Sequence, residues 1–209
     1  MKMDFLPLNS MKRIPLIFLL IPFLAVSQQS ETEILEHREE HKTELLDTSN
    51  HMLSIEEINE FQGLDYFNFD STFQLKATFT KDKGKKFEMP TSTNRLPIYR
   101  RYGYVDFIID SVPCRLTAYQ NIDLLKRDRK GFKNYLFIPY KDKTTRNETY
   151  GGGRFLDFKI PESTIALIDF NLAYNPYCAY SYRYSCPIPP DENTLKVEIK
   201  AGEKIPHGH

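Results

Sequence analysis

The hydrophobic pattern of the chain begins with helical signals. Two capping boxes, Ser30-Glu31-Thr32-Glu33 and Ser54-Ile55-Glu56-Glu57, come first. In such a box the serine and the glutamate each bond to a free backbone N–H of the first helical turn. We therefore predict a helix from about Glu31 to Leu46 and a short second helix that Gly63 ends. Apolar positions in the first helix are few, so only a narrow stripe of it can pack.

After these helices, apolar and polar residues alternate. Phe73, Leu75, Ala77 and Phe79 predict a half-buried strand, and residues 85–89 can return from it as a hairpin. Further short segments rich in Tyr, Phe, Ile and Val predict strands at 96–102, 104–110, 115–120, 135–139, 154–158, 165–170 and 195–200. No long amphipathic helix separates them. The sequence therefore predicts one mostly β domain, an antiparallel β-barrel or β-sandwich with short N-terminal helices.

The first residues have the layout of a secretory signal. Lys12 and Arg13 precede an apolar run at 14–24, and the small residues Ala25-Val26-Ser27 follow. An uncleaved anchor is the alternative, but the run is short and contains two prolines. We expect a signal peptide (1–27), an N-terminal helical segment (28–60) and a β-rich domain with a Cys/Pro-rich C-terminal motif (61–209). The protein would be periplasmic or secreted, with no stable membrane span after cleavage.

Charge excludes one class of partner. The chain has 28 basic and 28 acidic side chains, and loss of Lys2, Lys12, Arg13 and Asp4 with the signal leaves a net charge of −2. Nucleic acids favour a strongly basic face, so we expect no nucleic-acid partner.

Histidine placement limits the chemistry. The five histidines are His37, His41, His51, His207 and His209, so none lies between residues 51 and 207, which hold all the predicted strands. A conventional serine or cysteine hydrolase is therefore disfavoured. Residues 37–41 spell the H-x-x-E-H motif of some metalloproteases, but the charged surroundings favour a solvent-facing helix. We expect no metal and no cofactor.

Residues Glu148 to Arg154 form a special segment, because three consecutive glycines, 151–153, let another group approach the backbone closely. No Gly-Lys-Ser/Thr follows, so this is not a phosphate loop. The guanidinium fork of Arg154 can hold a ligand carboxylate. Alternatively, Arg154 pairs with Glu148 or Asp169 as part of the structure.

The C-terminal segment carries a second set of candidates. Asp169 and Asn171 flank one residue of a strand end and share a face. A carboxylate in an apolar stretch is either paired or functional. Cys178 and Cys186 lie in a stiff, proline-bounded loop. Export permits a disulfide between them, which would contribute about 2–3 kcal/mol in the chain-entropy model. A thiol nucleophile and a zinc site are the other interpretations, and Cys114 is left over as a small buried side chain.

These segments also resemble a known bacterial family. The motifs are Asp169-Phe170-Asn171, Asn175-Pro176-Tyr177-Cys178-Ala179-Tyr180, Cys186-Pro187-Ile188-Pro189-Pro190, Asn193, Ala201-Gly202-Glu203-Lys204 and Thr149 to Arg154. In this pattern the chain is similar to the family known as domain of unknown function 1684, over roughly residues 35–204. The resemblance implies no activity, because the biochemistry of that family is unassigned. It does imply that the polar groups of the two special segments form one shared site.

Three hypotheses for function follow. The first is an exported binding domain for a small-molecule or anionic ligand, contacted by Tyr150, Arg154, Asn171, Asn175, Tyr180 and Asn193. The second is a hydrolase with Asp169 or Glu148 as the base and Arg154 as the electrophilic stabiliser. The third is a structural envelope protein. All assume that residues 151–154 meet the 175–193 loop. Polar groups that line an open hollow would favour binding or catalysis, whereas sealed, mutually paired groups would favour a structural role.

Overall fold

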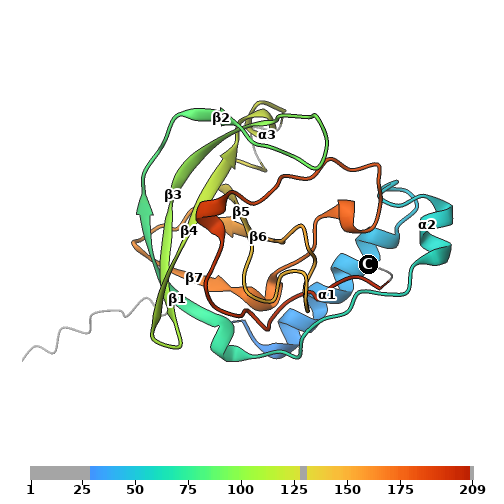
Figure 1. Ribbon diagram of the computed structural model, residues 1–209, viewed down its shortest axis with the longest axis horizontal. Helices are drawn as coiled ribbons and strands as arrows, with labels where there is room; N and C mark the ends of the chain where they lie inside the picture. Colours follow the sequence, from blue (N-terminus) through green and yellow to red (C-terminus); the bar gives the residue numbers. More distant parts are fainter. Residues whose placement is uncertain (1–28, 128–130, 208–209) are drawn as a thin grey trace, which may run out of the picture.

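The sheet dominates the computed structural model, which describes residues 29–127 and 131–207. The predicted signal peptide lies outside these residues. The strands pair antiparallel in the order β6-β5-β4-β3-β1-β7, with β2 beside β3, and the sheet curls into a half-barrel (Figure 1). Their bounds are β1 Gln74–Lys81, β2 Lys86–Glu88, β3 Ile98–Ile109, β4 Val112–Asn121, β5 Tyr135–Tyr140, β6 Arg154–Lys159 and β7 Ile165–Asp169. The mostly β, barrel-like fold is thus confirmed.

Both predicted N-terminal helices are present. In α1 (Glu31–Leu46) and α2 (Ile55–Glu60), the capping boxes of Ser30 and Ser54 are fully formed. A third helix, α3 (Ile122–Arg127), follows β4. Single turns of 3₁₀ helix occur at η1 (Ser71–Phe73), η2 (Phe170–Leu172), η3 (Tyr177–Ala179) and η4 (Asp191–Asn193). Among these described helices, none has the length and apolar character needed to span a membrane.

The inner stripe of α1 is not purely apolar. Ile34 and Leu45 are buried, as the narrow stripe predicts, but Arg38 is buried between them. Its guanidinium donates to the backbone carbonyls of Phe67 (3.1 Å) and Asn171 (3.3 Å). The interpretation of residues 37–41 as a solvent-facing helix is therefore wrong at Arg38, because hydrogen bonds to two carbonyls compensate for its burial.

Two strand predictions are wrong in detail. The segments predicted at 96–102 and 104–110 are one strand, β3, because a bulge between Arg101 and Gly103 lets both halves pair with β4. The predicted hairpin between residues 73–81 and 85–89 does not form. Instead β2 pairs with β3, through Lys86 opposite Arg100, because β1 already has β3 and β7 on its two sides.

The segment predicted as a strand at 195–200 keeps its alternation but not its partner strand. Leu195, Val197 and Ile199 are buried in the core, as expected for a half-buried strand. Its backbone bonds to the loop after β5, with Leu195 N–H donating to Lys141 O (2.8 Å). Its backbone neighbours are the loop after β5 and the side chain of Arg154. This C-terminal segment therefore closes the half-barrel without joining the sheet.

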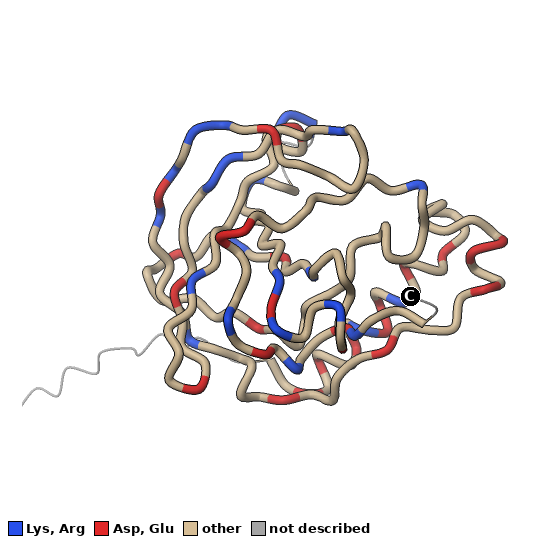
Figure 2. Tube along the Cα trace, in the orientation of Figure 1, with Lys and Arg blue, Asp and Glu red and all other residues tan. Residues whose placement is uncertain are grey.

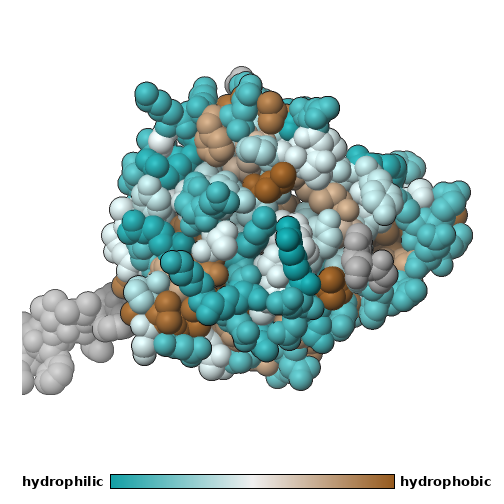
Figure 3. Space-filling view, viewed as in Figure 1, coloured by the Kyte–Doolittle hydropathy of each residue, from teal (hydrophilic) through white to brown (hydrophobic). Residues whose placement is uncertain are grey.

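Each face of the sheet carries a cluster of buried apolar residues, although the outer face stays exposed at Lys76, Thr78 and Thr80 of β1. Successive strand residues point to opposite faces, so Leu136 and Ile138 enter the main core while Phe137 enters a smaller aromatic cluster with Tyr119. The outside of the molecule, in the view of Figure 3, is largely hydrophilic, with apolar side chains in small groups.

Candidate functional site

The triglycine turn and the cysteine loop do come together. Gly153 has φ +88°, and a Cβ atom there would lie 2.6 Å from Tyr140 O and 2.8 Å from Pro189 Cγ. The Tyr150 side chain forms a hydrogen bond with Cys178. The glycine therefore permits the close approach that the sequence predicted, but the approaching group is the chain's own proline and carbonyl, not a ligand.

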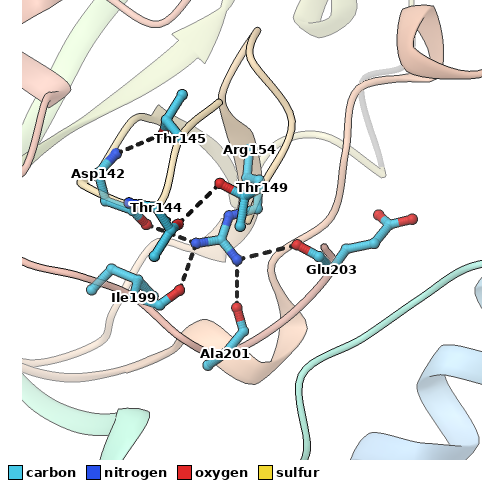
Figure 4. Close-up of polar contacts among 8 residues, drawn as sticks. All are labelled: Asp142, Thr144, Thr145, Thr149, Arg154, Ile199, Ala201 and Glu203. Atoms are coloured by element: carbon cyan, nitrogen blue, oxygen red, sulfur yellow. Dashed lines mark hydrogen bonds and ion pairs between the residues drawn. The ribbon is translucent and has the colours of Figure 1, made fainter. Parts of the chain in front are cut away.

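Arg154 is the centre of a buried polar network. Its side chain is 1% exposed. One terminal nitrogen donates to Asp142 Oδ2 (2.7 Å) and Ile199 O (2.8 Å), and the other donates to the carbonyls of Ala201 and Glu203 (Figure 4). The partner carboxylate is thus Asp142, and neither of the two carboxylates that the sequence suggested. The guanidinium fork binds the C-terminal segment of its own chain.

Asp142 is held from its other side by threonines. Its Oδ1 accepts from the N–H (2.7 Å) and hydroxyl (2.5 Å) of Thr144, whose oxygen also contacts Thr149 Oγ1 at 3.0 Å. The Asp142 side chain is completely buried. A buried ion pair of this kind contributes to stability only when further hydrogen bonds satisfy both partners, which is the case here.

A second buried group surrounds Glu203. Its Oε2 accepts from the Asn175 N–H at 2.5 Å and its Oε1 accepts from the Tyr180 hydroxyl, while Asn175 Nδ2 donates to the Tyr180 oxygen at 3.0 Å. Burial raises the pKa of Glu203 to about 7, although these hydrogen bonds and the charges of Arg154 and Arg38 favour the ionised form. Sequence analysis assigned no role to Glu203, although it stands in the Ala-Gly-Glu-Lys motif.

Asp169 and Asn171 bind each other, as their shared face predicts. Asp169 Oδ1 accepts from the backbone and side-chain nitrogens of Asn171, both at 2.9 Å, and Oδ2 accepts from Gln74 Nε2 at 2.7 Å. Asn193 is also fully buried, and it bonds to both backbone groups of Thr117 and to Pro139 O (2.7 Å). These side chains join loops to strands.

Glu148 stands apart from the network. Its side chain is 44% exposed and pairs with Lys200 at 3.0 Å. Of the predicted ligand-contacting residues, Arg154, Asn171, Asn175 and Asn193 face one another or backbone groups. Tyr180 also belongs to the paired groups through its hydroxyl, and it lines an open cavity as well. The sealed, mutually paired arrangement is the one that favours a structural role for the motif. We call this group, centred on Arg154, Glu203 and Asn193, the polar lock.

The predicted disulfide is not formed in this structure. Cys114, Cys178 and Cys186 are free thiols. Cys178 N–H donates to Cys186 Sγ at 3.2 Å, and the two thiols are hydrogen-bonded to each other. Cys178 also lines a cavity of about 370 Å³ between α2 and the cysteine loop. The pair is therefore close but reduced, with one member accessible.

The metalloprotease-like histidines do not form a metal centre. His41 packs edge-on against Tyr174, with ring centroids 5.6 Å apart, and burial lowers its pKa. Within residues 29–127 and 131–207, no three side chains of His, Cys, Asp or Glu are arranged to hold a metal ion.

Sequence analysis missed a groove on the outer face of β3 and β4. It has a volume of about 510 Å³. Its charged and aromatic lining residues are Lys85, Phe87, Arg101, Tyr104, Arg115, Tyr119 and one carboxylate, Glu192. We call it the cationic groove. The strand register creates it, because Arg101 lies opposite Tyr119 and Asp106 opposite Arg115. Only knowledge of this pairing could have revealed it.

Comparisons with known proteins agree with the resemblance seen in the motifs. No curated protein matches the chain. An uncharacterised protein of Haloarcula marismortui, solved by solution NMR, is 31% identical with a TM-score of 0.65, over 86% of this chain and 96% of that one. A family model described as "Protein of unknown function (DUF1684)" matches residues 59–204, which contain the whole sheet and the polar lock. The chain therefore belongs to the DUF1684 family.

Proposed function

We propose that this domain binds a small anionic molecule in the cationic groove, outside the polar lock. Two guanidinium groups lie against one aromatic ring there: Arg101 is 5.1 Å and Arg115 is 4.8 Å from the centroid of Tyr104. This pair of cations on one ring is the observation that carries the proposal. Arginine presents a planar fork that matches carboxylate and phosphate oxygens.

The present partners of these cations are exchangeable. Arg115 forms a two-point contact with Asp106 (2.6 and 3.1 Å), and Arg101 contacts Asp82 at 2.9 Å. Their side chains are 60% and 36% exposed, and such surface pairs contribute only about 0–1 kcal/mol. A ligand anion can therefore replace either carboxylate at little cost, which is impossible for the buried Arg154.

The rest of the groove supports a ligand that is more than a bare ion. Phe87 and Tyr119 provide aromatic walls, with ring centroids 5.8 Å apart. The Tyr119 hydroxyl donates to Glu192 Oε1 at 2.6 Å, and burial together with Glu192 raises the tyrosine pKa, so the hydroxyl stays a donor. The carboxylate of Glu192 favours a ligand that also carries a hydroxyl or amino group. A volume of about 510 Å³ lies within the range of small-molecule sites.

The charge distribution is consistent with this choice. Several Lys and Arg positions follow one another from the end of β1 into β2, although Asp and Glu lie between them (Figure 2). The ligand we infer is thus a carboxylate or phosphate ester with a ring or other flat apolar part. The predicted signal at residues 1–27 supports a periplasmic or extracellular place of binding.

The hydrolase hypothesis has less support. Asp169 is committed to hydrogen bonds from Asn171 and Gln74, and Arg154 is sealed inside the polar lock. Glu148 pairs with Lys200 at the surface. The geometry therefore favours binding at the cationic groove, with the polar lock as the structural support of the loops.

The test is calorimetric titration of the purified protein with phenyl phosphate, benzoate and inorganic phosphate at low and high salt. We expect saturable binding that is strongest for phenyl phosphate and weakens with salt. Arg101→Gln and Arg115→Gln should each raise Kd about tenfold, equivalent to about 1.4 kcal/mol. Arg183→Gln is the matched control, because it removes an exposed arginine that pairs with Glu57 away from the groove.

The proposal fails if the Arg101→Gln/Arg115→Gln double variant binds these anions as tightly as the unaltered protein. It fails equally if Arg183→Gln weakens binding as much as the groove variants do. Circular dichroism of each variant checks that the fold is retained.

A further inference from the structure

We infer that Cys178 and Cys186 form a redox-active dithiol, in which Cys178 attacks a small disulfide and Cys186 resolves the mixed disulfide. This site is separate from the cationic groove and does not depend on the binding function proposed above. It rests on the contact between the two thiols, on their unequal exposure and on the cavity beside Cys178.

Both cysteines are fixed by their backbones. Cys178 lies in the 3₁₀ turn η3, where Ser181 N–H donates to Tyr177 O at 2.9 Å. Cys186 forms two backbone hydrogen bonds with Ser92. The Ser92 N–H donates to Cys186 O (2.9 Å), and the Cys186 N–H donates to the Ser92 hydroxyl oxygen (3.2 Å). The thiols are therefore held in hydrogen-bonding contact. Formation of a disulfide requires the sulfur atoms to close to about 2.05 Å.

The two thiols differ in access. Cys186 is 8% exposed and belongs to the smaller aromatic cluster, whereas Cys178 is half-buried and lines the 370 Å³ cavity. A disulfide in that cavity lies against Cys178, while Cys186 is covered and does not line the cavity. This is the arrangement of an attacking thiol backed by a resolving thiol.

The polar neighbours favour the thiolate at Cys178. Hydrogen bonds from Cys186, Ser92 and Tyr150 lower the pKa of Cys178 to about 7, against the effect of burial. The same contact raises the pKa of Cys186, because its proton is donated to Cys178. Thiolate is the nucleophilic form, and a thiol whose pKa lies near the ambient pH is the most effective attacker.

The reaction balances as a two-electron exchange. The Cys178 thiolate attacks one sulfur of a disulfide R–S–S–R, forms a mixed disulfide and releases one thiolate, RS⁻. Cys178 then no longer accepts the Cys186 proton. Cys186 releases this proton to solvent and attacks Cys178 Sγ, which expels the second RS⁻. The substrate is reduced to two thiols, and the protein is left with a Cys178–Cys186 disulfide.

The cavity indicates the class of substrate. Its lining includes Phe61, Glu57 and Glu60. Arg183 pairs with Glu57 at 3.4 Å, so Glu60 supplies the main negative charge of the lining. This charge favours low-molecular-weight disulfides with amino groups over anionic ones. Cystamine is the matching probe, and oxidised glutathione is the anionic comparison.

The experiment exposes the full chain to cystamine, quenches with an alkylating reagent and identifies each cysteine by peptide mass spectrometry. We expect Cys178 and Cys186 to be lost together and recovered with cysteamine, while Cys114 stays alkylatable after denaturation. Cys186→Ser should accumulate a stable mixed disulfide at Cys178. Cys178→Ser should form none at Cys186, and Cys114→Ser should behave like the unaltered protein.

A measurement on the unaltered protein keeps the inference testable if a variant does not fold. Limiting iodoacetamide should modify Cys178 at least about tenfold faster than Cys186, with a pH midpoint near 7. Equal rates would overturn the inference, as would a Cys178–Cys186 disulfide that excess cysteamine does not reduce, since that bond would be purely structural. Faster reaction with oxidised glutathione than with cystamine would refute the assigned substrate class.

Discussion

Replacement of Arg154 by methionine is the most direct test of the polar lock. Methionine keeps much of the apolar volume but removes every donor of the guanidinium. The carboxylate of Asp142 would then be buried without its cation, and the carbonyls of Ile199, Ala201 and Glu203 would lose their side-chain donor. All of these groups lie where the C-terminal segment closes the half-barrel.

The expected loss of stability follows from the buried carboxylate and carbonyl groups that are left without a hydrogen-bond donor. Breaking a buried ion pair by removal of one partner costs about 3–5 kcal/mol. The total stability of a domain is about 5–15 kcal/mol, so Arg154→Met would remove a large share of it. With a urea m-value of about 2 kcal/mol/M, the unfolding midpoint should fall by about 1.5–2.5 M.

Urea unfolding followed by far-UV circular dichroism and by tyrosine fluorescence measures this shift, since the chain has 13 tyrosines and no tryptophan. Arg115→Met is the matched control: it breaks an exposed pair and should cost no more than about 1 kcal/mol. Asp142→Asn should recover part of the loss in the Arg154→Met background, because it removes the unpaired charge. A loss below about 1 kcal/mol for Arg154→Met would refute the reasoning.

Three further outcomes are expected. Asn193→Ala should lower the free energy of unfolding by about 3 kcal/mol in urea titrations, because three backbone partners lose their bonds; an unchanged midpoint would contradict this. Gly153→Ala should lower the melting temperature more than Gly63→Ala. Both glycines have a positive φ, but only at residue 153 would the added Cβ atom clash with neighbouring atoms. Equal decreases in melting temperature would contradict the close approach at Gly153. Glu203 has a raised pKa, so the folded state holds its proton more tightly. Protonation of Glu203 should therefore contribute about 3 kcal/mol to the free energy of unfolding. This contribution should be fully present below about pH 4.5 and lost as the pH rises through about 7. Glu203→Gln should remove this slope from stability measured against pH, and a slope that persists would assign it to other groups.

Local signals predicted the fold well. The capping boxes at Ser30 and Ser54 fix both helix starts, and strict alternation located the strands, because each signal is a property of a few neighbouring residues. The pairing of strands, in contrast, is not determined by neighbouring residues in the sequence. Nothing near residues 85–89 tells that β2 pairs with β3, and the alternation of Leu195, Val197 and Ile199 does not tell that their backbone meets a loop.

The candidate site was predicted in part for the same reason. The glycines and the cysteine loop were recognised as special, and they do meet. Arg154 pairs with Asp142 and not with Glu148 or Asp169. This pairing depends on three-dimensional distances, which the spacing of residues along the sequence does not determine. The cationic groove depends on the register of β3 against β4, so Tyr104 and Arg115 look like ordinary strand residues until the sheet is built.

The contacts of the C-terminal segment make the sheet depend on residues that lie far from it in the sequence. Leu195, Val197, Ile199 and Ala201 complete the main core, and the carbonyls that bind Arg154 belong to residues 199–203. A protease that cuts within residues 195–203 would therefore expose apolar core surface and leave the guanidinium of Arg154 without its carbonyl acceptors. The sheet would then have an open apolar face, which favours aggregation.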